Sequence, residues 1–283
     1  MAVVMISLNE GHNMGAVLEN LRGWAREVFL VDSFSTDDTV DVALRHGVHV
    51  VQRRFRGFGD QWNFALRELP ITASWTMKLD PDERLTDLLK QQLATAISAD
   101  DADGFSVMRR LWFMGQSLSV KHSLVRVWRS GRCRFTDVDV NEHPIVEGRV
   151  RQLDGEIEHH DSPSLEHWLA KQNNYTSAEA VTRFEGGALA AHPRLLGNSL
   201  ERRMWLKRNF WKVPGRYTIL FLYHLLAKGA WRAGRVGWIW ARLRTEVYRL
   251  CEYKTYEMRR LGRVPPAIPS QPGHPDPRVP QYD

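Results

Sequence analysis

The stretch from Glu27 to Gln52, EVFLVDSFSTDDTVDVALRHGVHVVQ, predicts a strand, a helix and a second strand in close succession. An apolar run of strand length stands at each end. Between them, Thr36 suits the N-cap of a helix, and Asp37 and Asp38 suit the positive end of its dipole. Gly47 suits the point where the helix stops. Two strands joined by one helix are typical of a parallel β-α-β unit.

The same alternation continues on both sides of this stretch. Further strands are predicted at 2–8 (AVVMISL) and 74–80 (SWTMKLD), and further helices at 14–25, 59–69 and 86–99. The first 100 residues therefore predict an α/β fold with a mostly parallel central sheet covered by helices. In such a sheet the functional groups collect at the carboxyl ends of the strands.

The pattern changes after residue 104. Shorter runs at 104–114, 123–129, 133–138 and 148–160 predict more antiparallel strands, and a helix over 164–184 is capped by Ser162 or Ser164. We expect an α/β domain over 1–190, a basic amphipathic helical region over 191–263 and a proline-rich tail over 264–283. The tail holds 7 of the 13 prolines, which favours extended chain.

Composition restricts the class of protein. The chain of 283 residues is 43% hydrophobic and 25% charged, a balance typical of globular proteins. Cys133 and Cys251 form neither a disulfide framework nor a CxxC metal site, which fits a reducing cytosol. The N-terminus lacks the basic start of a signal peptide and is interpreted as a first strand.

Acidic groups follow three of the predicted parallel strands. The stretch 74–84, SWTMKLDPDER, ends in Asp80, Asp82 and Glu83, while Glu10 and Asp32 follow the first two strands. Carboxylates gathered at one sheet edge repel one another, and a divalent cation with hard oxygen ligands would offset that repulsion. Alternatively, the acids at 82 and 83 simply open the next helix.

Several motifs together resemble family 2 glycosyltransferases of GT-A fold. They are ISLNEGHNMGAVLENL (6–21), VFLVDSFSTDDTV (28–40), GFGDQWNFAL (57–66) and MKLDPDERL (77–85). A later stretch at 139–176, which contains DVNEHP and GEIEHHD, is similar to the bacterial group that includes lipopolysaccharide core β-1,4-glucosyltransferases. The resemblance covers about residues 1–185 and implies inverting transfer of a sugar from a nucleotide donor.

The resemblance also implies roles for individual residues. A UDP-sugar would be bound by Ser7, Asn9, Glu10, Asp32, Gln61, Asn63 and Asp80. Mn²⁺ or Mg²⁺ would be held by Asp80, Asp82 and His160 and would neutralise the departing diphosphate. For the histidine, the alternative is a ring packed beside the sheet. Arg53, Arg54 and Arg56 either add diphosphate contacts or form a surface cluster.

Inverting transfer also needs a base that removes the proton of the acceptor hydroxyl. By the same resemblance the candidate is Glu142 in DVNEHP, with Asp137 and Asp139 as rivals. His143 either replaces the glutamate in this role or orients it.

The basic C-terminal region predicts a different partner. Residues 194–263 carry 17 Lys and Arg against 4 Asp and Glu, and 5 of the 11 tryptophans. Basic, amphipathic, tryptophan-rich helices fit an anionic membrane surface, although a helical subdomain with a solvated cationic face is the alternative. The longest uncharged apolar run, 217–227, is too short to span a bilayer. No motif that reads a nucleic-acid groove appears.

The expected protein is therefore a metal-dependent glycosyltransferase at the cytoplasmic face of a bacterial inner membrane, acting on a lipid-linked or lipopolysaccharide-type acceptor. By resemblance UDP-glucose is the default donor. Two alternatives remain. A nucleotidyltransferase or nucleotide-sugar pyrophosphorylase would need a glycine-rich basic loop after the first strand, which SLNEGHNMG matches poorly. A non-catalytic membrane scaffold would have a degenerate donor site.

Overall fold

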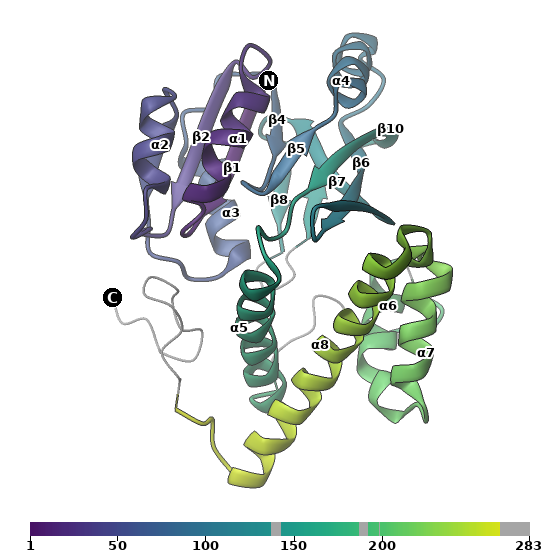
Figure 1. Cartoon of the computed structure of the whole chain (residues 1–283). Coiled ribbons are helices and arrows are strands. Elements are labelled where there is room, and N and C mark those ends of the chain that lie inside the picture. Colours follow the sequence, from purple (N-terminus) through teal and green to yellow (C-terminus); the bar gives the residue numbers. More distant parts are fainter. Residues whose placement is uncertain (137–142, 187–191, 198, 267–283) are drawn as a thin grey trace. The chain divides into compact units, whose positions relative to one another are not determined.

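The computed structural model describes residues 1–136, 143–186, 192–197 and 199–266 (Figure 1). Within this part the chain forms two compact units, one of residues 1–117 and 121–162 and the other of residues 118–120 and 163–266. The boundary between the units follows Ser162, so the helix predicted at 164–184 lies in the second unit. The predicted division into domains at residues 190 and 263 stays a prediction.

A mixed eight-stranded sheet forms the centre of the first unit. Its strands, in spatial order, are β3 (His49–Gln52), β2 (Glu27–Asp32), β1 (Ala2–Ser7), β4 (Trp75–Lys78), β7 (Gln116–Arg129), β6 (Gly104–Phe113), β10 (Val150–His159) and β5 (Glu83–Leu85). The four strands from β3 to β4 run parallel, as predicted. Beyond them β7 is antiparallel to both neighbours, whereas β10 runs parallel to β6. β8 (Cys133–Phe135) and β9 (Pro144–Val146) form a separate hairpin.

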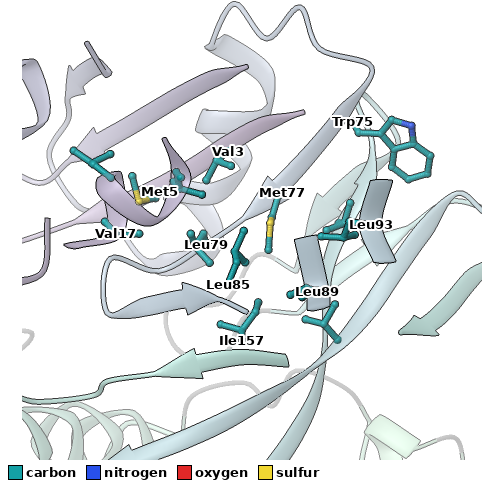
Figure 2. Packing of buried hydrophobic residues seen from close by; sticks show 14 of the residues in the cluster. Val3, Met5, Val17, Trp75, Met77, Leu79, Leu85, Leu89, Leu93 and Ile157 are labelled. Carbon is teal, nitrogen blue, oxygen red and sulfur yellow. The ribbon is translucent and has the colours of Figure 1, made fainter. Parts of the chain in front are cut away.

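Helices cover both faces of this sheet, because side chains alternate along each strand. The helices of this unit are α1 (Gly11–Leu21), α2 (Thr39–Arg45), α3 (Phe58–Glu68) and α4 (Asp87–Ala99). Val3, Met5 and Met77 face one core together with α1 and α4, where Figure 2 shows Val17, Leu89 and Leu93 pointing toward the strands. The alternate residues, such as Val4 and Phe29, face a second core around Trp62 of α3.

The helix predicted in the opening stretch begins later than expected. α2 starts at Thr39 with Asp38 at its N-cap position, so the prediction of Thr36 as N-cap is wrong. The backbone N–H of Thr36 instead donates to Oδ1 of Asn9, 2.8 Å away in the loop after β1. The predicted end of this helix at Gly47 is confirmed, since Gly47 follows the C-cap His46 and has a φ of +72°.

The acidic turn after β4 does not open a helix. Glu83 begins the short strand β5, and α4 starts only at Asp87, where Thr86 caps it by accepting a hydrogen bond from the N–H of Leu89. The alternative in which the acids at 82 and 83 open the next helix is therefore wrong. β5 pairs with β10, and this pairing fixes the end of the acidic turn at Glu83, while the other end follows β4, which pairs with β1 and β7.

The second unit is helical. It contains α5 (Leu165–Phe184), α6 (Ser199–Asn209), η1 (Phe210–Lys212), α7 (Arg216–Leu222), η2 (Tyr223–Ala227), η3 (Ala230–Ala233) and α8 (Gly234–Leu261). Ser164, one of the two predicted caps, precedes α5, and its hydroxyl accepts a hydrogen bond from the N–H of His167 at 3.1 Å. It packs on α8 through a core that includes Ala180 and Cys251. Lys254 joins the two helices by donating to the side chains of Thr176 and Ser177 at 2.9 and 2.8 Å. Among the described helices, none combines the length and apolar character needed to cross a bilayer.

Candidate active site at the carboxyl ends of the parallel strands

Asp32 organises the loops that follow β1 and β2. Its carboxylate is fully buried and accepts hydrogen bonds from the hydroxyl of Ser7 at 2.9 Å and the backbone N–H of Ser35 at 2.8 Å. The hydroxyl of Ser35 and the side-chain amide of Gln52 also donate to the Asp32 carboxylate, the amide at 3.1 Å. Ser7 and Asp32 are also paired across the parallel strands, which explains why residues distant in sequence meet here. The structure thus brings together two of the predicted donor-binding residues.

Asn9 and Glu10 lie in the loop next to Asp32. Asn9 adopts a positive φ of 55°, a conformation that asparagine tolerates better than most residues. Its backbone N–H donates to the hydroxyl of Ser35 at 2.8 Å. The carboxylate of Glu10 accepts a hydrogen bond from the amide of Asn13, also at 2.8 Å. These contacts join the first loop to Ser35, in the loop after β2, and to Asn13 of α1.

Asp80 and Glu83 stand at the two ends of the acidic turn, and Arg126 of β7 binds both carboxylates. The guanidinium is 2.9 Å from Oδ2 of Asp80 and also contacts Oε1 of Glu83. Within the turn, the N–H of Asp80 donates to the Glu83 carboxylate at 3.1 Å, and the N–H of Glu83 donates to the Asp80 carbonyl at 2.9 Å. The turn is therefore closed by its own hydrogen bonds, and one buried arginine binds the carboxylates at both of its ends.

The charges around the turn separate the behaviour of its two carboxyl groups. Burial on its own raises the pKa of Asp80, but Arg126 and Lys78 outweigh burial and hold that pKa at about 2. Burial dominates at Glu83 and raises its pKa, with the neighbouring charge of Asp80 adding to the effect. Of the two carboxyl groups, Asp80 is therefore the one that stays ionised down to the lower pH.

Asp82, between these two residues, belongs to a second cluster. Nε2 of His159 lies 3.2 Å from Oδ2 of Asp82 and 3.8 Å from Oδ1 of Asp161. One ligand atom from each of these three residues lies within 4.8 Å of the others. The predicted ligand His160 is turned elsewhere, with its ring stacked on Trp112 at 4.7 Å and its Nε2 3.3 Å from Glu158.

Strand alternation explains why His159 rather than His160 meets Asp82. Ile157 is fully buried in the core of the first unit, and His159 lies two residues further along the same face of β10. Glu158 and His160 lie on the opposite face. The role of His160 as a metal ligand stays a prediction, but the histidine beside Asp82 is His159.

The cluster of Asp82, His159 and Asp161 has the chemistry of a divalent-cation site. Two carboxylates and an imidazole are donors that Mn²⁺ and Mg²⁺ accept. Nε2 of His159, the ring nitrogen that faces both carboxylates, would be the coordinating atom. The three residues therefore fit such an ion.

Arg84 connects this cluster with the loop after β1. Its guanidinium donates to the carbonyl oxygens of Pro81 at 2.7 Å and Asn13 at 3.1 Å. Burial lowers its pKa, while the charges of Asp82 and Glu10 both act to raise it. The predicted residues Glu10 and Asp82 thus share one cationic neighbour.

Gln61 and Asn63 of α3 have different surroundings. Gln61 is fully buried, accepts from Arg53 at 2.7 Å and donates to Ser33 at 3.3 Å, which places it beside the loop after β2. Asn63 uses its amide on the backbone of Phe135, at 2.8 and 3.0 Å, and so holds β8 against α3. Both polar atoms of the Asn63 amide are engaged by this contact. Binding of the donor by Asn63 stays a prediction.

An open cavity of about 500 Å³ lies beyond the end of β3. Its lining residues are Arg53, Arg54, Arg56, Phe64 and Glu68. Arg53 pairs with Asp60 and lies over the Phe64 ring at 4.7 Å. The two interpretations of the arginines, diphosphate contacts or a surface cluster, both remain compatible with this arrangement.

The sequence analysis did not name Arg126 or Asp161 as members of the site, and of the two adjacent histidines it chose His160 rather than His159 as the metal ligand. A bulge in β7 gives the reason for Arg126: Phe105 pairs with Val127 and Ser106 with Val125, which leaves Arg126 as the extra residue. For His159 and Asp161 the signal is alternation from Ile157, which the apolar pattern of β10 expresses only weakly. The predicted base Glu142 and its rivals Asp137 and Asp139 lie outside the described residues.

Comparison with known proteins identifies the family. The family described as Glycosyl transferase family 2 matches residues 2–152. The lipopolysaccharide core biosynthesis glycosyltransferase LpsC of Rhizobium meliloti is 26% identical over 277 residues, which cover 94% of this chain and 95% of LpsC. An uncharacterized glycosyltransferase of Rickettsia prowazekii is 23% identical over 207 residues, or 68% of this chain and 70% of that protein.

Two solved structures are more distant. Residues 1–349 of S. aureus TarS, in complex with UDP-GlcNAc, align at a TM-score of 0.47 with 15% identity, over 93% of this chain and 92% of that one. Glucosyl-3-phosphoglycerate synthase from Mycobacterium tuberculosis, with Mn²⁺ and UDP, aligns at 0.32 with 22% identity, over 38% of this chain and 43% of that enzyme. The assignment depends instead on the sequence match over more than half of the chain: this protein is a glycosyltransferase and belongs to glycosyl transferase family 2.

Proposed function

We propose that this enzyme transfers a hexose, with inversion, from a UDP-sugar to a lipid-linked or lipopolysaccharide-type saccharide in the assembly of a bacterial surface glycan. The observation that carries the proposal is the cluster of Asp82, His159 and Asp161 beside Asp80, at the carboxyl ends of the parallel strands of a family 2 glycosyltransferase. The full-length similarity to LpsC supports the class of acceptor.

The proposed reaction is a single displacement. The oxygen of an acceptor hydroxyl forms a bond to the anomeric carbon as the bond from that carbon to the diphosphate oxygen breaks, and the electron pair leaves with the diphosphate. The hydroxyl proton passes to a carboxylate, for which Glu142 is the predicted base. Because attack is from the side opposite the leaving group, the configuration at the anomeric carbon inverts.

The residues of the site would divide the remaining work. Asp82, His159 and Asp161 would hold a divalent cation, which when bound supplies positive charge for the diphosphate that departs. Arg126 holds the acidic turn in place. Asp32 fixes the two loops that carry the predicted nucleotide-binding side chains.

The other classes considered from the sequence are not favoured. Family membership argues against a nucleotidyltransferase or pyrophosphorylase. A scaffold with a degenerate donor site would not be expected to keep a buried arginine on two carboxylates and a histidine between two more.

The proposal is tested by a donor-hydrolysis screen. Purified enzyme is incubated with UDP-glucose, UDP-galactose, UDP-GlcNAc and GDP-mannose, each with Mn²⁺ or with EDTA, and release of the nucleoside diphosphate is measured. We expect slow cleavage of one UDP-sugar that requires the metal and is lost in Asp82→Asn. Equal rates with EDTA, or cleavage of GDP-mannose alone, would contradict the proposal.

A further inference from the structure

An apolar stripe on the second unit faces solvent rather than a core. Ile219 and Leu222 of α7 and Tyr223 and Leu226 of η2 follow the i, i+3, i+4, i+7 spacing of one helix face. Each of these four side chains is 44% to 59% exposed. In a helix of a soluble domain this face normally packs inward, and a contiguous exposed apolar surface marks an interaction site.

Two exposed tryptophans lie on the segments that follow the stripe in the chain. Trp231 of η3 and Trp238 of α8 are 53% and 51% exposed. The ring of Trp238 contacts that of Phe221 on α7, with the centroids 6.0 Å apart in an edge-to-face arrangement. We name the six exposed side chains the outer apolar patch: Ile219, Leu222, Tyr223, Leu226, Trp231 and Trp238.

Cations accompany the aromatic members of this patch. Nζ of Lys228 lies 5.7 Å from the ring of Tyr223, and the guanidinium of Arg232 lies 5.3 Å from the ring of Trp231. Arg235 is exposed on the next turn. The surrounding sequence, 202–245, contains 11 Lys and Arg and no Asp or Glu. The patch therefore lies in a segment that carries charge of a single sign.

We infer that the outer apolar patch docks on the surface of a bilayer that contains anionic lipids. Its leucines and isoleucine would enter the boundary between head groups and acyl chains, its tyrosine and tryptophans would lie at head-group level, and the cations would contact lipid phosphates. The inference fits the proposed lipid-linked acceptor and adds to that function a membrane-contact surface, at what we propose is the cytoplasmic face of the inner membrane.

The charge pattern favours a membrane over a protein partner. A second copy of this chain would present the same cations beside its patch, Lys228, Arg232 and Arg235, and these would repel one another across a symmetric contact. An anionic leaflet instead offers a continuous negative surface, to which each nearby Lys or Arg adds about fivefold in binding. The described helices do not span a bilayer, so the contact is with its surface.

The test measures cosedimentation of the full chain with vesicles of phosphatidylcholine alone or mixed with phosphatidylglycerol. We expect binding to the anionic vesicles at low salt and release at about 1 M salt, where the Debye length is about 3 Å. Wild-type protein that stays in the supernatant with both vesicle types would overturn the inference.

Matched substitutions locate the contact. Leu226→Glu places a charge in the patch, while Leu44→Glu makes the same change on α2 of the first unit; the two leucines are 59% and 56% exposed. We expect Leu226→Glu to weaken vesicle binding by on the order of tenfold or more, and Leu44→Glu to leave it unchanged. The triple change Lys228→Gln, Arg232→Gln, Arg235→Gln should weaken binding by on the order of 100-fold. Equal behaviour of the two leucine variants would contradict this location.

Two further readouts separate this inference from the proposed function. Circular dichroism confirms folding of each variant, and hydrolysis of soluble UDP-sugar should be unchanged in Leu226→Glu. If no donor is hydrolysed but vesicle binding follows the pattern above, the docking surface stands and the proposed function fails. If light scattering shows an oligomer that Leu226→Glu dissociates, without vesicle binding, the patch is a contact between copies and the inference is wrong.

Discussion

Arg126 of β7 and Glu83 of β5 form an ion pair in which both side chains are buried, with exposed fractions of 4% and 0%. The same guanidinium is 2.9 Å from Asp80, at the other end of the acidic turn. Asp82 lies between these two carboxylates in the sequence, so a single arginine holds the segment that presents it to His159. Arg126 is thus a positioning residue of the site.

Replacing Arg126 with methionine should strongly destabilise the protein. The variant removes the guanidinium that contacts the buried Glu83 carboxylate most closely and leaves Arg109 3.6 Å away. Breaking a buried pair by removing one partner costs roughly 3–5 kcal/mol in the free energy of unfolding. Urea unfolding monitored by circular dichroism measures this loss.

The control for that variant is Arg22→Met. Arg22 pairs with Glu19 on the surface, where the two side chains are 68% and 58% exposed. An exposed pair contributes about 1 kcal/mol or less to the free energy of unfolding. Similar losses in Arg126→Met and Arg22→Met would show that the buried pair does not hold the turn.

Stability should depend on pH with opposite signs at the two ends of the turn. The pKa of Asp80, about 2 in the folded protein against an ordinary 3.8, means that its stabilising charge is present above 3.8 and lost as pH falls through 2. The raised pKa of Glu83 means that stability is highest below 4.5 and declines as pH rises through the folded value.

Amide variants separate these two titrations. The free energy of unfolding of the wild type minus that of Asp80→Asn should shrink as pH falls toward 2. The same difference for Glu83→Gln should shrink as pH rises above 4.5. Urea titrations at several pH values measure both differences. A pair of differences with the same slope would contradict the assigned charge states.

Much of the fold could be predicted because its signals are local. The apolar runs and caps of the first 100 residues predict β1 to β4 and their helices, and Gly47 does mark the end of α2. Thr36 was the wrong N-cap because its N–H binds Asn9, a residue 27 positions earlier in the chain. The short strand β5 was missed since only its pairing with β10 makes it a strand.

Only part of the site could be predicted from the sequence. The carboxyl-end rule places Asp32, at the end of β2, and Asp80 and Asp82, after β4, at the same edge of the sheet without any knowledge of their contacts. Arg126 was not predictable in this way, because a bulge in strand pairing decides which face it takes. The choice of His159 over His160 depends on the register of β10, which the apolar pattern of that strand expresses only weakly.

Gly155 should be intolerant of any side chain. It lies where the pairing of β10 with β6 shifts, and a Cβ there would meet the Cα of Leu89 at 2.5 Å. Because the neighbour is helix backbone, Gly155→Ala should cost roughly 1–3 kcal/mol in the free energy of unfolding. Gly15→Ala on α1 meets nothing within 4 Å and should stabilise by about 0.5–1 kcal/mol. Thermal unfolding distinguishes them, and equal melting temperatures would contradict the close packing of β10 on α4.

Glu142→Gln should abolish sugar transfer while UDP binding survives, since the amide keeps the shape of the side chain but removes the base. Transfer to a lipid-linked acceptor and calorimetric UDP affinity are measured together. The matched variant Glu147→Gln changes an acid five residues further along and should transfer normally. Near-normal turnover of Glu142→Gln would eliminate the predicted base.

The cation site is tested most directly by calorimetric titration of Mn²⁺ with and without UDP. If Asp82, His159 and Asp161 hold an ion that contacts the diphosphate, UDP should raise the affinity for Mn²⁺ by roughly 5- to 150-fold, and Mn²⁺ should raise the affinity for UDP by the same factor. Asp82→Asn and His159→Ala should lose this coupling, and His160→Ala should keep it. Coupling that survives in His159→Ala but disappears in His160→Ala, or its absence from the wild type, would contradict the assigned site.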